Sequence, residues 1–440
     1  MVVGCTTSQS TAHPVDFAVN RAPLCYHHLT MKSDLDALME QRNLDALLVE
    51  GPDGMGSANP AFAYLARGAH VVGSVIHKRG GNPQLIYRSM ERDEAERSGL
   101  ELVNLDRWPV HEIQQQAESQ LGARVELYRR ILTDLDVRGR VGLYGTGPIG
   151  AYHTLLGQLS EALPNIEFVG EYTEDVISLA RQTKDADEIN ALRRVGVSAC
   201  EVLEEVVSFW RSHEVRNQTL VRRDGSPLTI GDTKAVIRME QAKRGLESPA
   251  DFICALGRDA GVPHSRGNPD DPIELGRPIL IDFFPRDESG YFHDVTRTFC
   301  LGHAPDEVQS AYRDVMDAFN AVVAEFRLGE ATQAYQHYIC GFFKDRGHPD
   351  PTSDPTTTDG YVHSLAHGLG LEVHEAPYFR TFGPSDTVLE PGMVFTVEPG
   401  LYYPDRGYGV RIEDTYYVDE AGGFHSLTPF PKDLVVDVGA

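Results

Sequence analysis

The first 180 residues alternate between two patterns of apolar and polar positions. Residues 33–45, SDLDALMEQRNLD, place apolar side chains at helical spacing after a serine that can cap a helix. Residues 46–50, ALLVE, form a short apolar run typical of a strand, and residues 70–88 predict two more strands joined at a Gly-Gly-Asn turn. Strands that alternate with helices indicate an α/β domain, which we expect to end near Leu179.

A glycine-rich stretch, VGLYGTGPIGAY, lies near the end of this region. Gly145, Gly147 and Gly150 match the G-x-G-x-x-G fingerprint of dinucleotide-binding proteins. However, Pro148 falls where the helix of that motif should start, and the motif lies at the end of the domain instead of in its first βαβ unit. We therefore interpret the stretch as a glycine turn and not as a nucleotide site.

A long amphipathic helix is predicted to follow, within residues 180–210. Its apolar positions, with charged residues between them, are Ile189, Leu192, Val195 and Ala199. A chain of 440 residues exceeds the roughly 250–300 residues at which a single core usually stops growing. We therefore expect an N-terminal arm of residues 1–32, an α/β domain of residues 33–183 and a larger domain of residues 184–440.

Composition and charge disfavour several classes of protein. The net charge of −25 and the lack of a Lys/Arg cluster argue against a nucleic-acid partner. Six scattered cysteines without a C-x-x-C pair favour reduced thiols over a disulfide framework or a zinc finger. The N-terminus has no signal-peptide core, and no apolar run approaches the ~18 residues of a membrane span. These observations predict a cytoplasmic protein that does not enter a membrane.

One pattern occurs twice in the second half: a glutamate, a glycine and an acid, then a turn and a second acid followed at plus two by a threonine. In the first copy, IELGRPILIDFFPR with HDVTRTF, these residues are Glu274, Gly276, Asp282, Asp294 and Thr296. In the second copy, VLEPGMVFTVEPGL with VRIEDTYYV, they are Glu390, Gly392, Glu398, Glu413 and Thr415. The repeat predicts two similar β-hairpins, each with a carboxylate on both strands.

Four carboxylates close together repel one another unless cations compensate their charge. The stretch HSLAHGLGLEVHEAP adds histidines, and one histidine with four carboxylates suits Mn²⁺ or a related divalent ion better than a thiolate-type zinc site. Two such ions would activate water and polarise a carbonyl group. The alternative is that the acids cap turns and pair with Arg297 and Arg411, which a single hairpin would favour.

With these motifs the chain resembles the pita-bread metallopeptidases, the family of methionine aminopeptidase, aminopeptidase P and prolidase. The resemblance extends over most of the chain and implies an α/β creatinase-like N-terminal domain followed by an α+β pita-bread catalytic domain. It also implies a homodimer and two divalent metal ions, with Mn²⁺ favoured over Co²⁺, Zn²⁺ or Fe²⁺. The long N-terminal domain favours the proline-specific branch, whose members hydrolyse the N-terminal bond of Xaa-Pro dipeptides or peptides.

The resemblance also implies roles for individual residues. The implied metal ligands are Asp282, Asp294, His367, Glu398 and Glu413. In the family, the equivalents of Asp294 and Glu413 bridge both metals. The equivalent of Asp282 holds one metal, and those of His367 and Glu398 hold the other. Glu398 would also shuttle a proton to the leaving nitrogen, and His264 and His374 would donate hydrogen bonds to the developing oxyanion. His363 and Arg411 match substrate-side residues of the proline-specific members.

Two features depart from the usual pattern of the family. Asp282 and Asp294 are twelve residues apart instead of the eleven seen in many members, which adds a residue to the turn between them. The polar stretch of residues 213–247 is longer than the usual connection between helices. It predicts either a surface insertion or a substrate gate.

Other functions compete with a peptidase. Creatine amidinohydrolase shares the two-domain build but uses no metal, and a metal-dependent lyase of the superfamily lacks the equivalents of His264 and His374. Non-catalytic pita-bread modules that bind peptides usually lose metal ligands, whereas this chain retains the set. A peptidase acting on small peptides is therefore favoured, with a binding module and a non-peptidase enzyme as the alternatives. Dipeptides and longer peptides both stay open as substrates.

Overall fold

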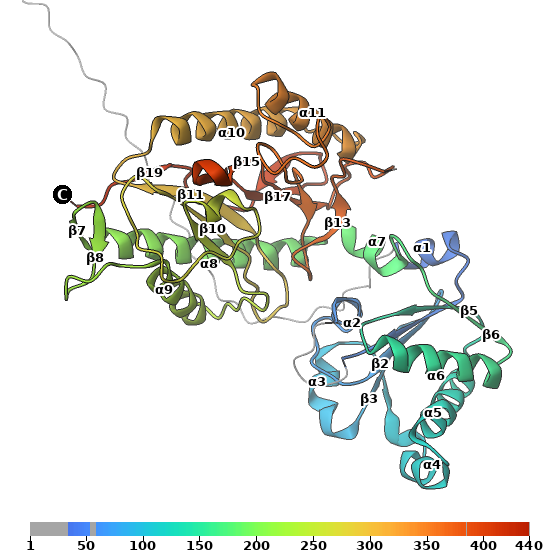
Figure 1. Cartoon of the computed structure of the whole chain (residues 1–440). Coiled ribbons are helices and arrows are strands. Elements are labelled where there is room, and N and C mark those ends of the chain that lie inside the picture. The colour runs from blue at the N-terminus through green and yellow to red at the C-terminus, as the bar shows by residue number, and fades with distance from the viewer. Residues whose placement is uncertain (1–33, 53–58, 384, 440) are drawn as a thin grey trace, which may run out of the picture. The chain divides into compact units, whose positions relative to one another are not determined.

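The structure is a computed structural model that describes residues 34–52, 59–383 and 385–439, so the predicted arm of residues 1–32 lies outside the described residues. The first half contains a six-stranded sheet with the strand order β4-β3-β2-β1-β5-β6 (Figure 1). Its strands are β1 (Ala46–Glu50), β2 (Ser74–Lys78), β3 (Gln84–Tyr87), β4 (Glu101–Asn104), β5 (Gly139–Tyr144) and β6 (Ile166–Val169).

The apolar run of β1 explains its place inside this sheet, because four of its five residues are buried. β1 pairs antiparallel with β2 and parallel with β5. The strand pair predicted within residues 70–88 is confirmed as the antiparallel β2–β3 hairpin. Gly80 adopts a positive φ of 75° in its turn, a conformation that glycine adopts without strain.

Helices pack against this sheet through apolar side chains. In the described part of the first half they are α1 (Leu35–Gln41), α2 (Pro60–Leu65), α3 (Arg92–Arg97), α4 (Val110–Gln116), α5 (Gln120–Asp134), α6 (Ile149–Ala162) and α7 (Val176–Gln182), with short 3₁₀ turns η1 (Ser89–Glu91) and η2 (Leu105–Arg107). Leu132 of α5 and Leu159 of α6 share a core with Leu48 of β1. The predicted cap, Ser33, lies outside the described residues, and Asp34 precedes α1 without a side-chain capping bond.

The glycine-rich stretch forms the connection between β5 and α6. Gly145 has a φ of +117°, and a Cβ on it would lie 2.6 Å from the backbone oxygen of Glu50. Pro148 is the residue before the helix, which begins at Ile149. The close approach of two backbone segments thus accounts for Gly145, in agreement with its interpretation as a glycine turn.

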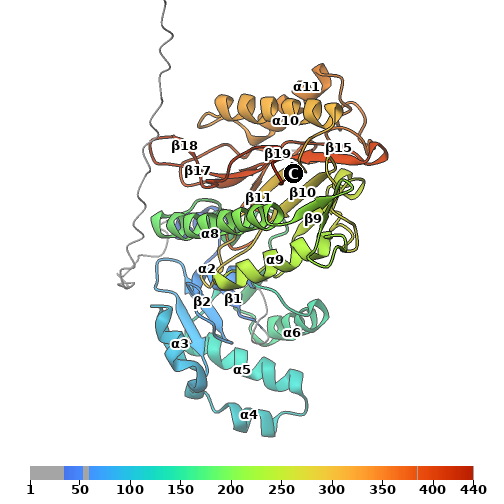
Figure 2. The ribbon, with the colours of Figure 1, turned by 90° about the vertical axis from the view of Figure 1, so that its left-hand side faces the viewer.

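The predicted amphipathic helix is confirmed as α8 (Ala186–Arg211). It begins with a capping box in which the Asp185 side chain accepts from backbone N–H groups and Glu188 bonds back to the backbone of Asp185. All four apolar positions predicted for it are buried. Residues 213–247 form a short hairpin, β7 (Glu214–Arg216) with β8 (Thr219–Val221), and then α9 (Ile230–Lys243), which lies beside α8 (Figure 2).

Two larger sheets and a separate hairpin make up the rest of the second half. The first sheet has the order β19-β11-β10-β9 and the second has the order β13-β12-β14-β17-β18. Their strands are β9 (Ile253–Leu256), β10 (Pro278–Phe283), β11 (Val295–Leu301), β12 (His367–Gly368), β13 (Glu375–Tyr378), β14 (Val394–Val397), β17 (Asp414–Val418), β18 (Phe424–Ser426) and β19 (Val435–Val436), and the hairpin consists of β15 (Gly400–Tyr403) and β16 (Tyr408–Arg411). Short 3₁₀ turns are η3 (Asp259–Gly261) and η4 (Pro404–Arg406).

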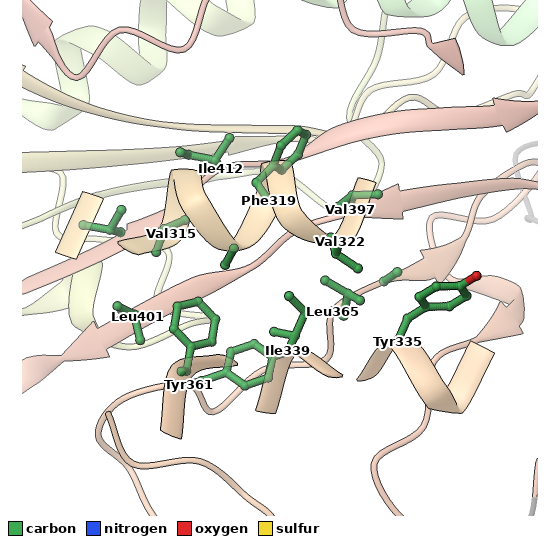
Figure 3. Close-up of a cluster of buried hydrophobic side chains, with 14 of the residues drawn as sticks. Val315, Phe319, Val322, Tyr335, Ile339, Tyr361, Leu365, Val397, Leu401 and Ile412 are labelled. Carbon is green, nitrogen blue, oxygen red and sulfur yellow. The ribbon is translucent and has the colours of Figure 1, made fainter. Parts of the chain in front are cut away.

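Helices cover these strands on two sides. Helices α8 and α9 share a core with β9, β10 and β11, whereas α10 (Asp306–Glu325) and α11 (Thr332–Asp345) share another with β14, β15 and β16. Figure 3 shows this second core, to which Val315 and Phe319 of α10, Ile339 of α11 and Leu401 of β15 all contribute, with Phe319 beside Ile412. The strands therefore lie between two pairs of helices. None of the described helices is long and apolar enough to cross a membrane.

Candidate metal centre

Both predicted strand pairs are present, but the second is not a simple hairpin, because β15 and β16 lie between its two strands. The registers of the two pairs also differ. β10 pairs with β11 so that Asp282 lies opposite Thr296. β14 pairs with β17 so that Thr396 lies opposite Thr415, and Glu398 follows two residues later. The first acid of the second copy is therefore shifted by two residues along its strand. A shift of two keeps a side chain on the same face, so both acids can face one site.

The threonine at plus two in each copy joins the two hairpins. Thr296 Oγ1 donates to Glu413 Oε2 at 2.6 Å, and the Glu413 N–H donates to the backbone oxygen of Thr296 at 3.1 Å. In the opposite direction, Thr415 Oγ1 donates to the backbone oxygen of Asp294 at 2.9 Å. Each threonine thus bonds to the second acid of the other hairpin. This reciprocal contact brings Asp294 and Glu413 together.

The resulting cluster has the properties of a cation site. Asp294, His367 and Glu413 each offer a ligand atom, and these atoms lie within 4.8 Å of one another. One carboxylate oxygen of Asp282, of Asp294 and of Glu413 is buried without a hydrogen-bond partner among the described residues. Such oxygens cost desolvation free energy that a bound cation would offset. Since the donors are carboxylates and an imidazole, the residues fit a divalent metal ion.

Burial and mutual repulsion raise the pKa of two of these acids. The pKa of Asp294 lies well above its ordinary value because the carboxyl is buried and because Glu413 and Asp282 are nearby. The pKa of Glu413 is also raised well above its ordinary value, first by burial and then by the negative charge of Glu398. These carboxyls therefore resist ionisation in the metal-free protein, and a cation would reverse that preference.

Glu398 differs because two histidines face it. Nδ1 of His363 lies 3.1 Å from Glu398 Oε2, and Nε2 of His367 lies 3.3 Å from Glu398 Oε1. Burial opposes ionisation, but these histidines lower the pKa of Glu398 to about 2. Glu398 and Asp282 lie outside the group of three ligand atoms within 4.8 Å, and each contacts a basic side chain instead.

His367 is arranged as a neutral ligand. Burial lowers the pKa of His367 to about 4, so its imidazole carries no charge near neutral pH. Its Nδ1 lies 3.1 Å from the backbone oxygen of Gly368 and can donate to it. That hydrogen bond leaves the lone pair on Nε2 directed at the acids, as is usual for a metal-binding histidine.

The other predicted histidines lie next to this group. Nε2 of His264 is 3.3 Å from Nε2 of His363, so His363 connects His264 with Glu398. His374 is exposed, and its ring packs against the ring of His367 with 4.2 Å between the centroids. The structure thus brings the predicted substrate-side histidines beside the predicted metal ligands.

Arg411 is deeply buried, with 1% of its surface exposed. Its guanidinium donates to the carboxylate of Asp282, to the hydroxyl of Tyr402 at 2.9 Å and, through Nε, to Thr296 Oγ1 at 3.0 Å. Arg411 therefore holds a predicted metal ligand directly. Its contact with substrate stays a prediction.

Arg297, the other arginine of the competing explanation, does not pair with the acids of the centre. It pairs with Asp414 at 2.8 Å and is also almost fully buried. Pairing with arginines therefore accounts for Asp282 alone among the four acids and leaves Asp294 and Glu413 uncompensated.

Sequence reasoning missed several residues next to the centre. Tyr402 supports Arg411, but one tyrosine in the apolar strand GLYY carries no signal that distinguishes it. Arg181 and Lys184 both bond to the buried carboxylate of Glu375, although the sequence of their stretch indicates only a charged connector. The sequence shows two cations three residues apart, but no pattern in it identifies Glu375 as their partner.

Residues 190–420 match the metallopeptidase family M24. The Xaa-Pro dipeptidase of Pyrococcus furiosus is 30% identical over 296 residues, which are 67% of this chain and 77% of that protein. A probable dipeptidase, PepE, of Mycobacterium bovis is 28% identical over 347 residues, covering 77% of this chain and 83% of that protein. The chain belongs to metallopeptidase family M24.

Solved structures agree with this assignment. The Xaa-Pro dipeptidase of Bacillus anthracis matches with a TM-score of 0.70 at 25% identity, over 91% of this chain and 97% of that one. The X-Pro aminopeptidase of Thermotoga maritima matches with the same TM-score of 0.70 at 23% identity, over 91% of this chain and 100% of that one, and shares the fold. The predicted fold class, an α/β creatinase-like part followed by an α+β pita-bread part, is confirmed. The predicted domain boundaries stay a prediction.

Proposed function

We propose that this chain is a metal-dependent peptidase that cleaves the N-terminal peptide bond of substrates with proline at the second position. The observation that carries the proposal is the cluster of Asp294, His367 and Glu413, whose ligand atoms lie within 4.8 Å, in a chain of family M24. The names of the relatives from Pyrococcus furiosus and Bacillus anthracis support the choice of Xaa-Pro substrates.

The proposed metal ligands are Asp282, Asp294, His367, Glu398 and Glu413. The oxygen-rich donor set favours two divalent ions, Mn²⁺ first, because hard carboxylate ligands suit such ions. Bound there, the metal pair would act as a Lewis acid and lower the pKa of water so that it attacks at neutral pH. The acids with raised pKa values would release their protons on binding, so metal affinity should rise with pH.

The protein's own side chains would then carry the proton transfers. Glu398, with its pKa lowered to about 2, is ionised at neutral pH and can accept a proton from the attacking water and pass it to the leaving nitrogen. His363, 3.1 Å from Glu398, holds that carboxylate in place. His374 and His264 can donate hydrogen bonds to the carbonyl oxygen as negative charge develops on it.

A panel of peptides tests this function. The protein is loaded with Mn²⁺ and assayed on Xaa-Pro, Xaa-Pro-Yaa, Xaa-Ala and Met-Ala, while elemental analysis measures its metal content. We expect cleavage of one or both proline substrates and about two metal ions per chain. Cleavage of Met-Ala alone would contradict the proline-specific assignment. A protein without stoichiometric metal and without activity would instead favour the alternative of a peptide-binding module.

The proposed assembly is a homodimer. Its support is the resemblance to the family, and the mass measured by light scattering should be about twice the monomer mass of 48.7 kDa. A strictly monomeric and fully active enzyme would contradict it.

A further inference from the structure

A second group of charges lies directly behind His374. Its next residue, Glu375, begins β13, and its carboxylate is buried with 6% of the side chain exposed. Lys184 Nζ donates to this carboxylate at 2.6 Å, and Arg181 Nη2 donates to its other oxygen. Arg181 also pairs with Glu372 at 2.9 Å. Two cations and two anions thus form a balanced cluster, which we call the Glu375 cluster.

The Glu375 cluster closes the loop that carries His374. A Cβ on Gly370 would lie 2.3 Å from Glu375 Oε1, so the carboxylate occupies the space that this glycine leaves open. The N–H of Glu372 also donates to Glu375 Oε2 at 3.4 Å. Residues 368–375 therefore fold around the carboxylate of Glu375, and the position of that carboxylate determines the position of the loop.

The two cations come from a segment that is tied to the metal centre. The N–H of Lys184 donates to the backbone oxygen of Gly392 at 2.7 Å, and Thr183 forms a bridge with Met393, next to β14. β14 leads directly to Glu398. The segment thus links the strand before Glu398 with the loop before His374.

His374 itself has little else to hold it. Its side chain is exposed, and among the described residues none hydrogen-bonds its imidazole. Its observed ring contact is with His367. The position of the His374 ring therefore depends on the backbone of the residue that follows it.

We propose that Lys184 and Arg181 are positioning residues for His374, which they hold over the metal centre through the carboxylate of Glu375. The inference rests on the proposed function, since it assigns to His374 the task of meeting charge on the substrate carbonyl. It predicts that the segment of residues 181–184 influences the rate of the chemical step without touching substrate or metal.

Two variants of Lys184 test the idea in the metal-loaded enzyme. Lys184→Met should lower kcat by about 10–100-fold, the range seen when partners that orient the ligands of a metal site are removed, with KM and metal content unchanged. Lys184→Arg should restore most of the loss because it retains the cation. Arg129→Met, which breaks an ion pair with Glu126 on α5, is the control and should leave kcat unchanged.

A double-mutant cycle separates positioning from a general loss of structure. If Lys184 acts through His374, Lys184→Met should have no further effect on kcat once His374 is replaced by alanine. The proposal would be overturned if the losses of kcat in the two single variants multiplied in the double variant. It would also be overturned if Lys184→Met lost its metal, or if Lys184→Arg were no more active than Lys184→Met. If Lys184→Met folds poorly, the double variant with Glu375→Gln keeps the cluster neutral and gives the same readouts.

A spectroscopic readout keeps this proposal separate from the proposed function. With ¹³C-labelled histidine, the imidazole signal of His374 is identified by its loss in His374→Ala. It should shift in Lys184→Met, return in Lys184→Arg and stay unchanged in Arg129→Met, whether or not any peptide is cleaved. A His374 signal unmoved by Lys184→Met would overturn the positioning role, whereas failure of every Xaa-Pro peptide would overturn only the function.

Discussion

Glu398 has surroundings unlike those of the other acids of the centre. Its two histidine neighbours hold its pKa at about 2, and the proposed reaction needs it as an ionised base. Glu398→Gln keeps the shape but removes the charge, so kcat on an Xaa-Pro substrate should fall by about 10²–10⁴-fold, the usual contribution of a general base. Glu420→Gln, at an exposed position, is the matched control. Full activity of Glu398→Gln with normal metal content would refute the role.

His374 should affect the rate in a different way. An oxyanion donor acts more strongly in the transition state than in the ground state, so its loss changes kcat more than KM. His374→Ala should lower kcat by about 10²–10³-fold with little change in KM or metal content. Steady-state kinetics and elemental analysis check both parts. If the variant lost its metal, His374 would instead support the ligands.

At this scale the sequence is informative wherever a spacing occurs twice. Asp294 and Glu413 are predicted from their repeat, because a threonine at plus two marks each of them. The repeat does not reveal that each threonine bonds to the other hairpin, since such contacts join residues more than a hundred positions apart. Lys184 is missed for the same reason, because its partner, Glu375, is 191 positions away in the sequence.

At the scale of elements, local patterns predict well and short strands escape prediction. The β2–β3 hairpin and α8 are predicted because periodicity and turn residues specify them within one stretch of sequence. The hairpin of β15 and β16 lies between Glu398 and Glu413, where the repeat predicts a turn. β12 has only two residues and carries no periodicity. Its pairing with β13 and β14 depends on tertiary contacts.

The bonds between the hairpins predict a coupled effect on stability and metal binding. Thr296→Val retains the shape but removes the hydroxyl that donates to Glu413 and accepts from Arg411. The free energy of unfolding should fall by about 1–3 kcal/mol, the cost of leaving a buried polar group unpaired, and metal affinity should weaken. Denaturant unfolding and metal titration measure the two effects.

Thr154→Val provides the control for that experiment. Thr154 lies exposed on α6 and bonds within its own helix, so this change should stay within about 0.5 kcal/mol. If both variants lost the same free energy of unfolding, the contact between Thr296 and Glu413 would contribute no more to stability than an exposed hydroxyl does.

At the scale of the whole molecule, length and alternation of elements predict the two-part architecture, and the repeat predicts the family. Apolar patterns specify which faces are buried, so the two cores of the second half follow from them. The substrate does not follow in the same way. An Xaa-Pro dipeptidase and an X-Pro aminopeptidase share this fold, so the residues that build the fold leave the length of the substrate open.

The metal-free protein should be less stable at neutral pH than at mildly acidic pH, because of charges within the centre. The pKa of Asp294 is raised in the folded state, so the folded protein binds more protons than the unfolded chain above the ordinary aspartate pKa of about 3.9. The contribution of Asp294 to the free energy of unfolding is thus fully present below that pH, and it is lost as the pH rises through the raised pKa of the folded state. A tenfold difference in proton affinity between the folded and unfolded states corresponds to about 1.4 kcal/mol.

Asp294→Asn isolates this effect, since asparagine does not ionise. Without metal, the variant should become more stable than the natural protein as the pH rises from about 4 to 8, because the natural protein must either hold a proton or ionise a buried carboxyl beside Glu413. With Mn²⁺ the order should reverse, since the variant has lost one of the proposed metal ligands and gains less from binding. Thermal unfolding of both proteins, with and without Mn²⁺ across this range, measures the four curves. If the two metal-free curves run parallel, the acids of this centre do not repel one another as their burial implies, and the electrostatic basis for a metal site is lost.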